Sequence, residues 1–251
     1  MGEDERNKMT RDNIEKNVAY TREYKQLRES FDWLFEKSGE HEESILLGEG
    51  EYRAEVFNHT QQYTANNGER QYNIAALITV FDKNDREITQ IKAIDEDRVF
   101  INLIHHQNGR KYLLYRQDLY GYSVMDVESG ETVDFIPKSS FVPVGGKEME
   151  METFIWCESK YCKTNNLLVV YGCYWACPFE FEFYDFSKPL EVPFHYYGDS
   201  YSLQKKMGIE FAHHGIDDVD FNESGECVFK IENDDKNMAK TISVDVMTNA
   251  M

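Results

Sequence analysis

Apolar and polar residues alternate at every second position through most of this chain, a spacing typical of β-strands rather than helices. One central stretch shows the pattern most clearly. It contains an apolar run at residues 112–115 and an alternating run at residues 121–127. A turn at residues 128–131 then leads to a second alternating run at residues 132–136, which Pro137 ends. The sequence therefore predicts three consecutive strands here.

Similar segments recur before and after this stretch, each ending in an aspartate that follows Phe, Met, Tyr or Val. These aspartates are Asp82, Asp126, Asp185 and Asp245, spaced 44, 59 and 60 residues apart. An aspartate at this position can accept hydrogen bonds from backbone N–H groups of the turn that follows it. One four-stranded sheet cannot bury both of its faces alone. Repeats of this length therefore predict about four small sheets stacked as the blades of a β-propeller.

Two of these segments resemble blades of a WD-repeat-like β-propeller. Residues 217–229, DDVDFNESGECVF, resemble the first strand, turn and second strand of a blade. Residues 124–133, VMDVESGETV, resemble the third strand, turn and fourth strand. The resemblance extends over about residues 45–250, although the Gly–His and Trp–Asp dipeptides of WD repeats proper are absent. It implies a propeller that serves as a platform for protein partners.

Two features leave the closure of this propeller open. Residues 179–183, FEFEF, alternate without a break, which predicts one apolar face and one wet face, whereas a blade between two neighbours hides both. Either this strand faces outward, or the sheets form an incomplete arc, whose ends a second copy of the chain could meet. Alternatively, residues 45–57 could supply the outer strand of the last blade and close the ring. A β-sandwich of eight or more strands is the alternative fold.

The N-terminal region differs from the rest, because its apolar residues recur at steps of three and four. This spacing marks one face of a helix, and its members are Ile14, Val18, Tyr24, Leu27, Phe31, Leu34 and Phe35. We expect one helix over about residues 11–37, ending before Gly39. The chain is thus divided into a helical segment, residues 1–44, that docks on a β domain, residues 45–251. The same apolar face could instead bind a partner helix.

Charge and composition narrow the classes of partner. The 251 residues include 27 Lys and Arg against 46 Asp and Glu, a formal charge of −19 that repels nucleic acid and anionic lipid. A basic protein partner is compatible with this charge, and so is a simple role in solubility. No apolar run approaches the length of a membrane span, and the charged N-terminal residues do not resemble a signal peptide. With an odd number of cysteines, five, the sequence predicts a cytoplasmic protein with free thiols.

Four cysteines have a spacing that suggests a zinc site at first sight: Cys157, Cys162, Cys173 and Cys177. If they lie on the two strands of one hairpin, Cys162 is at the turn and faces Leu167. Cys177 then lies about 33 Å further along its strand, too far for one ion to bind both. Cys157 is expected opposite Gly172 and near Cys173, and two thiols do not make a site. Buried structural cysteines are the favoured interpretation.

Histidines and acids suggest two further metal sites. The pairs His105–His106 and His213–His214 are each adjacent in sequence, so on a regular strand the two rings of a pair point to opposite faces and cannot bind one ion. A site that combines the second pair with nearby acids would favour zinc or nickel. Asp218, Asp220 and Asn222 open like a calcium loop, but Glu223 and Phe229 stand where that loop needs glycine and glutamate. We interpret these acids as turn formers.

Glu180 and Glu182 are the remaining candidates for catalysis. Same-side residues on a strand lie about 7 Å apart, within the range of a glycosidase carboxylate pair. Alternating glutamates on a solvent-exposed strand face give the same pattern and are the favoured interpretation. Gly145 and Gly146 lack the strand-to-helix context of a phosphate-binding loop and are expected in a linker. The sequence therefore assigns no catalytic, metal-binding or cofactor-binding residue and implies no cofactor.

The sequence as a whole predicts an all-β protein with an N-terminal helix and a small or incomplete propeller. Its predicted function is a protein-interaction module whose partner has a basic surface, for example an inhibitor or immunity-type protein. The acidic charge and the aromatic residues around 171–175 and 195–197 motivate this hypothesis. The alternative is a hydrolase acting on a glycan or small molecule, with carboxylates at the propeller mouth. Whether the chain is an enzyme stays open, and neither nucleic acid nor membrane is expected as a partner.

Overall fold

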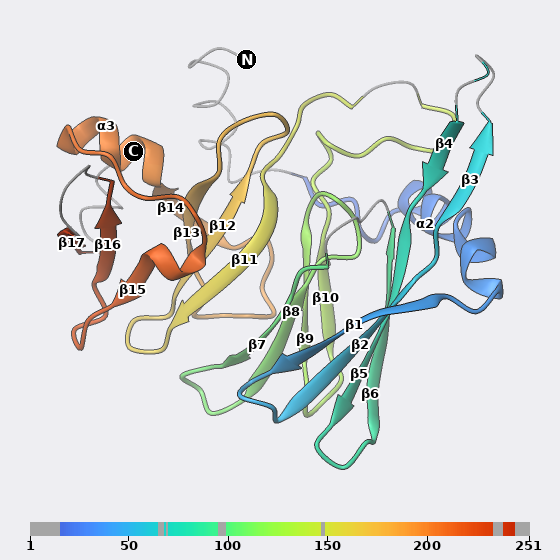
Figure 1. The fold of residues 1–251 in the computed structure, drawn as a ribbon, viewed down its shortest axis with the longest axis horizontal. Helices are drawn as coiled ribbons and strands as arrows, with labels where there is room; N and C mark the ends of the chain where they lie inside the picture. Colours follow the sequence, from blue (N-terminus) through green and yellow to red (C-terminus); the bar gives the residue numbers. More distant parts are fainter. Residues whose placement is uncertain are drawn as a thin grey trace.

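The computed structural model describes residues 16–64, 68, 70–94, 99–146, 149–232 and 238–243. This part of the chain is mostly β-structure, arranged in four antiparallel sheets and one separate two-stranded hairpin, with a few short helices (Figure 1). The all-β prediction is confirmed at this level. Asp245 and Ile14, which figured in the sequence patterns, lie outside the described residues.

Each sheet is formed by one stretch of the chain, which in the first sheet is interrupted by a separate hairpin. The first sheet contains β1 (Glu40–Leu47), β2 (Tyr52–Asn58), β5 (Ala75–Asp82) and β6 (Glu87–Ile94). The second contains β7 (Ile101–His105), β8 (Lys111–Tyr115), β9 (Tyr122–Asp126) and β10 (Thr132–Phe135). The third contains β11 (Ile155–Cys162), β12 (Leu167–Cys173), β13 (Glu180–Asp185) and β14 (His195–Asp199). The fourth contains β15 (Val219–Phe221), β16 (Cys227–Ile231) and β17 (Met238–Ile242), while β3 (Gln61–Thr64) and β4 (Arg70–Asn73) form the separate hairpin.

Three apolar cores join the sheets in sequence, face against face. Val56 and Ile78 of the first sheet pack with Leu113 of the second. The next residue, Leu114, points to the opposite face and packs with Trp156 and other side chains of the third sheet. A third core, which includes Phe181, Phe183, Val219 and Phe229, joins the third sheet to the fourth. Strand alternation thus lets each inner sheet contribute to two cores.

The first strands of consecutive sheets lie next to one another. The Asn102 side chain in β7 donates to the backbone carbonyl of Ser159 in β11 at 3.0 Å. Lys160 in β11 donates in turn to the carbonyl of Val219 in β15 at 3.0 Å. The turn after β1 approaches the second sheet through Glu51 and His105, whose Oε2 and Nε2 atoms lie 3.3 Å apart. Within the described residues the four sheets form an open series, with the first and fourth at opposite sides of the molecule (Figure 1).

The prediction that residues 45–57 complete the last sheet is wrong. These residues form parts of β1 and β2, which pair with each other in the first sheet, so that Leu47 lies opposite Tyr52. The physical reason is the tight turn between them. Gly48, Glu49 and Gly50 all have positive φ angles of 55–88° and reverse the chain at once. β1 and β2 therefore pair with each other in the first sheet, and neither is available to complete the last one.

The three recurring aspartates within the described residues occupy equivalent places, each at the end of the third strand of its sheet. Asp82 accepts from the N–H groups of Asn84 (2.8 Å) and Arg86 (3.0 Å). The N–H groups of residues 128 and 129 donate to Asp126 at 2.9 and 3.0 Å. Asp185 accepts from Ser187 at 2.8 Å. The turn chemistry expected from the sequence is confirmed for these three positions.

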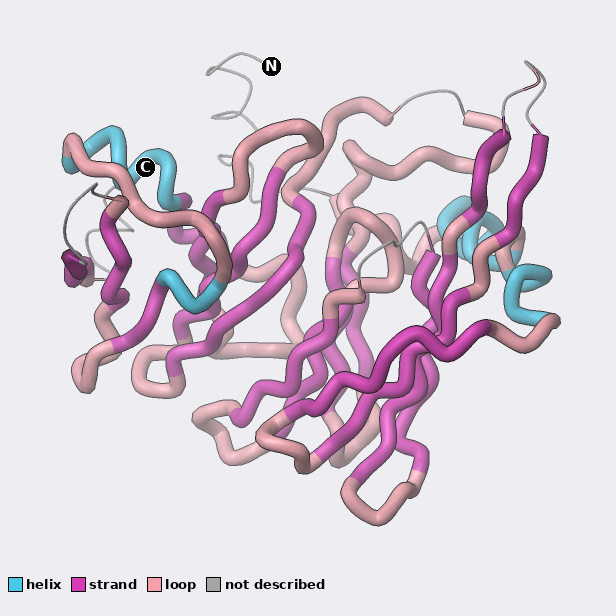
Figure 2. The backbone as a smooth tube through the Cα atoms, in the orientation of Figure 1, coloured by secondary structure: helices cyan, strands magenta, loops and turns pink. Residues whose placement is uncertain are grey.

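The N-terminal helical region is shorter and more broken than expected. The structure shows α2 (Arg22–Glu29), capped by the Thr21 hydroxyl, and then a 3-10 helix, η1 (Asp32–Glu36). The N–H of Ser30 bonds to the carbonyls of both Gln26 and Leu27, so the helix tightens and ends there. Strand β1 begins at Glu40, inside the segment assigned to the helical region. Figure 2 shows these short helices against the surrounding strands.

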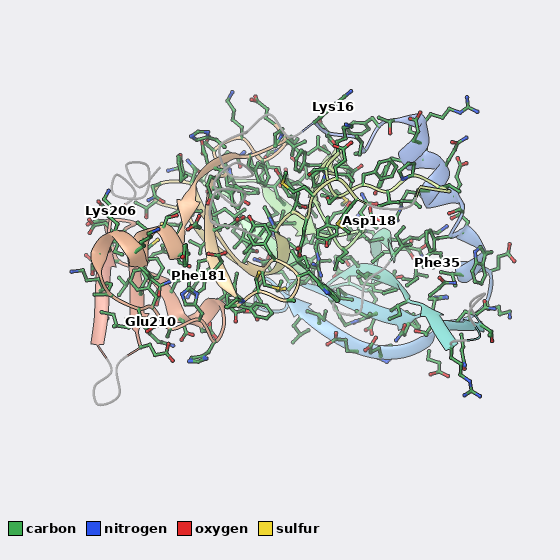
Figure 3. The ribbon with its side chains drawn as sticks, turned by 90° about the horizontal axis from the view of Figure 1, so that it is seen from above. Lys16, Phe35, Asp118, Phe181, Lys206 and Glu210 are labelled. Atoms are coloured by element: carbon green, nitrogen blue, oxygen red, sulfur yellow. The ribbon has the colours of Figure 1, made fainter. Side chains whose placement is uncertain are left out.

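The described part of the N-terminal segment packs against the β-structure. Tyr24 packs with Val18, Ala19 and Ile136, and Leu34 packs with Ala75 and Ile94. Before α2, residues 16–18 run beside residues 136–138, where a bridge joins Asn17 to Pro137. Between the third and fourth sheets lie α3 (Ser200–Met207) and a 3-10 turn, η2 (Ile216–Asp218). Figure 3 shows Phe35 of η1 and Phe181 of β13 in different parts of the molecule.

Candidate interaction surface

The loop between β12 and β13, residues 174–179, carries two large exposed aromatic side chains. Trp175 is 67% exposed and Phe179 is 36% exposed. The loop is folded tightly, because the N–H of Cys177 donates to the carbonyl of Tyr174 at 2.9 Å. The Phe179 ring stacks on the Tyr171 ring, with centroids 5.0 Å apart and an interplanar angle of 20°. An exposed tryptophan therefore lies on an ordered loop.

The connection that leads into β11 lies against this loop. The backbone N–H of Trp175 donates to the Glu152 carboxylate. Met151, the residue before Glu152, is 37% exposed. Burial raises the pKa of Glu152. We name Met151, Glu152, Trp175 and Phe179 the Trp175 surface. It combines apolar and aromatic area with one partly buried carboxyl group.

The loop that carries Trp175 also contacts a buried carboxyl group. Glu182 is only 3% exposed. The hydroxyl of Tyr174 donates to its Oε1 at 3.2 Å, and the hydroxyl of Tyr184 donates to its Oε2. Burial raises the pKa of Glu182 well above its usual range, and Glu180 and Asp199 raise it further, although the tyrosine hydrogen bonds lower it. The protonated, neutral form of Glu182 is therefore favoured.

A second acid continues this network toward α3. The Tyr196 hydroxyl donates to Asp199 Oδ2 at 2.7 Å. Asp199 Oδ1 accepts from the N–H of Ser202 at 2.6 Å and so caps the helix. We name Tyr174, Glu182, Tyr184, Tyr196 and Asp199 the acid–tyrosine cluster. It fixes the ends of β13 and β14 and the start of α3 to one another.

The acid–tyrosine cluster also holds the exposed loop in place. Tyr174 is 5% exposed, and the next residue, Trp175, is 67% exposed. The hydroxyl of Tyr174 is anchored on Glu182 below, while the N–H of Trp175 is anchored on Glu152 beside it. The loop is thus bound on two sides. This arrangement presents the Trp175 ring to solvent with little freedom left in its backbone.

The expectation of a wet glutamate face on β13 is wrong. Glu180 and Glu182 are 8% and 3% exposed. Glu182 is covered by Tyr184 of β13 itself and by Tyr174 of the preceding loop, and the period-two pattern of one strand does not reveal the contact with the loop. Of the aromatics expected at the surface, Trp175 is exposed, whereas Tyr171 and Tyr196 are buried.

The cysteines lie where the predicted hairpin register places them, with one displacement. Cys162 faces Leu167, as expected. A bulge at Cys157 then shifts the register, so that Trp156 rather than Cys157 lies opposite Gly172. None of the five cysteines forms a disulfide in the structure. Within the part of the chain that the structure describes, no group of three or more His, Cys, Asp or Glu side chains is placed to hold a metal ion.

The two rings of the first histidine pair point to opposite faces, as the sequence predicted. His105 is exposed. His106 is buried, donates from Nε2 to the Phe186 carbonyl at 2.9 Å, and accepts at Nδ1 from the N–H of Asn108 at 3.2 Å. These contacts fix the neutral tautomer that carries its proton on Nε2. His106 therefore has a structural role in the core between the second and third sheets.

The second pair and the acids after it also serve the structure. His213 stacks on Phe181 at 5.1 Å, and burial lowers its pKa. Asp218 pairs with Lys230 at 3.0 Å and accepts from the N–H of His214 at 2.7 Å. Asn222 accepts from two N–H groups of the turn after β15. Gly145 and Gly146 lie in the connection between β10 and β11.

Comparisons with known proteins add little to this picture. None of the helices in the described ranges is long and apolar enough to cross a membrane. No family model matches the sequence. The chain is similar to Uncharacterized protein R762 of Acanthamoeba polyphaga mimivirus, with 25% identity over 109 residues. That stretch covers 42% of this chain and 39% of the viral protein, so the similarity spans about two fifths of each.

Proposed function

We propose that this protein is an interaction module that binds a basic protein partner through the Trp175 surface. The observation that carries the proposal is Trp175, which is 67% exposed on a loop held by hydrogen bonds on two sides. Tryptophan is among the residues that most often dominate binding energy at protein interfaces. A side chain whose backbone is already ordered loses less entropy on binding. The loop therefore has the properties of a preformed anchor.

Charge supports a cationic partner. The chain carries a formal charge of −19, which accelerates encounter with a positively charged protein. At the contact itself, a Lys or Arg side chain can lie over the exposed Trp175 ring and gain a cation–π interaction. The Glu152 carboxylate accepts from the backbone N–H of the same residue and, when ionised, can pair with a cation at this surface. An inhibitor or immunity-type role against a basic protein is a specific form of this proposal.

The arrangement of the sheets is compatible with a propeller-like platform. Three four-stranded sheets and one three-stranded sheet follow one another, and the first strands of the second, third and fourth lie side by side, as blades around an axis would place them. We propose that the chain is an open, WD-repeat-like arc of this kind. Its five cysteines form no disulfide in the structure, which favours a reducing, cytoplasmic setting. The hydrolase alternative needs carboxylates that a substrate reaches, and the burial of Glu180 and Glu182 gives it no support.

The proposal is tested by comparing captured partners of three versions of the full chain. Wild type, Trp175→Ala and Trp33→Ala are used as baits, and the bound proteins are quantified by mass spectrometry. Trp33 is also exposed, at 41%, so it is the matched control. We expect a partner with basic surface that Trp175→Ala loses and Trp33→Ala retains, and whose affinity for purified wild type falls with rising salt. Equal capture by all three baits, or binding insensitive to salt, would refute the proposal.

A further inference from the structure

A cavity of about 430 Å³ opens on the first sheet, away from the Trp175 surface. Its walls come from η1, from the start of β1, and from the chain that leaves β2 and enters β3. This volume falls in the range of small-molecule sites. In Figure 1 this corner of the molecule lies beside α2 and β3, whereas the loop between β12 and β13 belongs to the third sheet. We name this cavity the Trp33 pocket.

The floor of the Trp33 pocket is fixed by buried contacts. His59 is buried, and its Nδ1 lies 3.1 Å from the carbonyl of Leu34. The His59 ring also packs against Phe35, with centroids 5.1 Å apart. A Cβ atom at Gly39 would lie 2.5 Å from the ring, so the packing is close on that side too. The pocket therefore has a preformed base.

Neutral hydrogen-bonding groups make up much of the wall. Asn58, Gln61 and Gln62 contribute carboxamides, and Ser38 and Thr60 contribute hydroxyls. Each carboxamide offers two donors and one acceptor, and each hydroxyl can do both. The Thr60 hydroxyl already donates to Asn58 Oδ1 at 2.9 Å, which orients that amide. A ligand that matches this wall presents several groups that both donate and accept.

One flat apolar surface and a balanced charge complete the lining. Trp33 lines the pocket and is 41% exposed. Lys37 and Glu40 are its charged members, one of each sign. A phosphate group would need more positive charge, especially in a chain of −19, and a metal ion would need more than one carboxylate. The lining thus favours a neutral ligand with one apolar face and many hydroxyl groups.

We propose that the Trp33 pocket binds a neutral sugar unit of a glycan. The ring C–H face of a sugar packs on the Trp33 indole, and its hydroxyl groups bond to the carboxamides of Asn58, Gln61 and Gln62. The lining contains one carboxylate, that of Glu40. Glycosidases use a pair, so the site binds the sugar without cleaving it. This inference uses none of the residues on which the proposed protein-binding function rests.

The test is titration of the full-length, isotope-labelled protein with simple sugars, followed by NMR. The probes are methyl glycosides of glucose, galactose, mannose and N-acetylglucosamine, and their disaccharides. Adenosine and inorganic phosphate are the comparison ligands. We expect at least one sugar to shift the Trp33 indole N–H and the amide groups of the pocket. Trp33→Ala and Gln62→Ala should each weaken that binding about tenfold or more.

Trp175→Ala is the matched control, since it removes an exposed tryptophan elsewhere, and it should bind the sugar as wild type does. Trp33 and Gln62 are both exposed, and unchanged melting temperatures would show that their variants fold. The proposal is overturned if no sugar shifts the Trp33 signal at about 50 mM, a concentration that detects even millimolar affinity. It is also overturned if Trp33→Ala binds normally, or if adenosine or phosphate binds more tightly than every sugar. Loss of partner capture by Trp175→Ala tests the proposed protein-binding function and does not bear on sugar binding.

Discussion

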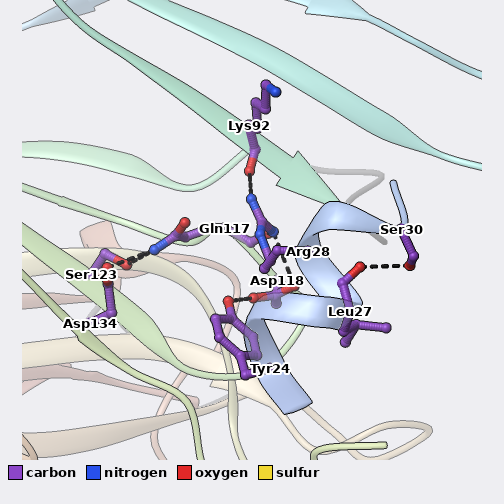
Figure 4. Close-up of polar contacts among 9 residues, drawn as sticks. All are labelled: Tyr24, Leu27, Arg28, Ser30, Lys92, Gln117, Asp118, Ser123 and Asp134. Atoms are coloured by element: carbon purple, nitrogen blue, oxygen red, sulfur yellow. Dashed lines mark hydrogen bonds and ion pairs between the residues drawn. The ribbon is translucent and has the colours of Figure 1, made fainter. Parts of the chain in front are cut away.

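The guanidinium group of Arg28 lies 3.2 Å from the carboxylate of Asp118, and this ion pair joins α2 to the loop between β8 and β9 (Figure 4). Arg28 also donates to the carbonyl of Gln117 at 2.7 Å and to the carbonyl of Lys92 in β6. One side chain of the N-terminal segment thus connects the first and second sheets. Tyr24, one turn earlier on the same helix, donates to Asp118 as well.

Replacing this arginine should loosen the N-terminal segment. Arg28→Ala leaves two carbonyl groups and Asp118 without their cation, and we expect a loss of about 2 kcal/mol in the free energy of unfolding. Arg28→Lys should retain only part of this stabilisation, because one ammonium group cannot reproduce the planar, forked set of donors of a guanidinium group. Urea unfolding measures the change. Arg22→Ala, at an exposed position of the same helix, is the control, and equal losses in both variants would contradict the role given to Arg28.

Asp126 should matter more than the equivalent Asp185. Asp126 is fully buried, accepts from two turn N–H groups and pairs with Arg110 at 2.7 Å. Asp126→Ala leaves these groups without their partner, and we expect a loss of about 3 kcal/mol. The carboxylate of Asp185 accepts from one turn N–H, and Asp185→Ala should cost about 1 kcal/mol. Thermal unfolding of both variants compares them, and a larger effect at position 185 would contradict the prediction.

The buried Glu182 should give the protein a characteristic dependence on pH. In the unfolded chain this carboxyl loses its proton near its ordinary pKa of 4.5, whereas burial raises the pKa well above that value in the folded protein. Folding therefore takes up a proton between the two pKa values. Stability from this group is complete below the lower value and is lost as the pH rises toward the folded pKa.

Glu182→Gln removes this titration while keeping the size of the side chain. We expect the stability of wild type to fall relative to Glu182→Gln as the pH rises, by up to about 1.4 kcal/mol per pH unit. Urea unfolding of both proteins from about pH 5 to about pH 8 measures the difference. A constant difference across this range would show that Glu182 does not keep a raised pKa.

Two glycines separate the effect of backbone conformation from that of close packing. Gly109 and Gly121 have similar positive φ angles, 86° and 92°. A Cβ at Gly109 would meet no atom within 4 Å, whereas one at Gly121 would lie 2.2 Å from the carbonyl oxygen of Phe135. Gly109→Ala should cost about 1 kcal/mol from the left-handed conformation alone. Gly121→Ala adds displacement of β10 and should cost about 4 kcal/mol, as thermal unfolding would show. Equal losses of stability in the two variants would mean that β10 can shift away from the added Cβ without a measurable cost.

The hairpin of β11 and β12 shows how far sequence reasoning extends. Strand alternation and a short turn suffice to place Cys162 opposite Leu167, because pairing next to a tight turn has few alternatives. Further along, the bulge at Cys157 shifts the partner of Gly172 to Trp156. A Cβ at Gly172 would lie 2.0 Å from the carbonyl oxygen of Ile155, so the bulged strand passes very close there. Only a glycine in a strand signals such an approach beforehand.

The candidate surface could be predicted only in part. Tyr174 and Trp175 are neighbours of similar chemistry, yet one is buried and the other exposed. Tyr174 donates to the buried Glu182, and local spacing in the sequence does not indicate this contact between the loop and β13. The Trp33 pocket was not foreseen at all. Its walls come from residues 33–40, which lead into β1, and from residues 58–62, which follow β2. Nothing in the local spacing of these residues indicates that the two segments meet.

Because each sheet shares an apolar core only with its neighbours, separating a terminal sheet opens one such core, whereas displacing an inner sheet opens two. Loss of structure should therefore begin at the ends of the series and proceed inward, rather than occurring everywhere at once. Backbone amides of β8 and β12 would exchange with solvent most slowly. The fourth sheet could detach and return while the other three stay assembled.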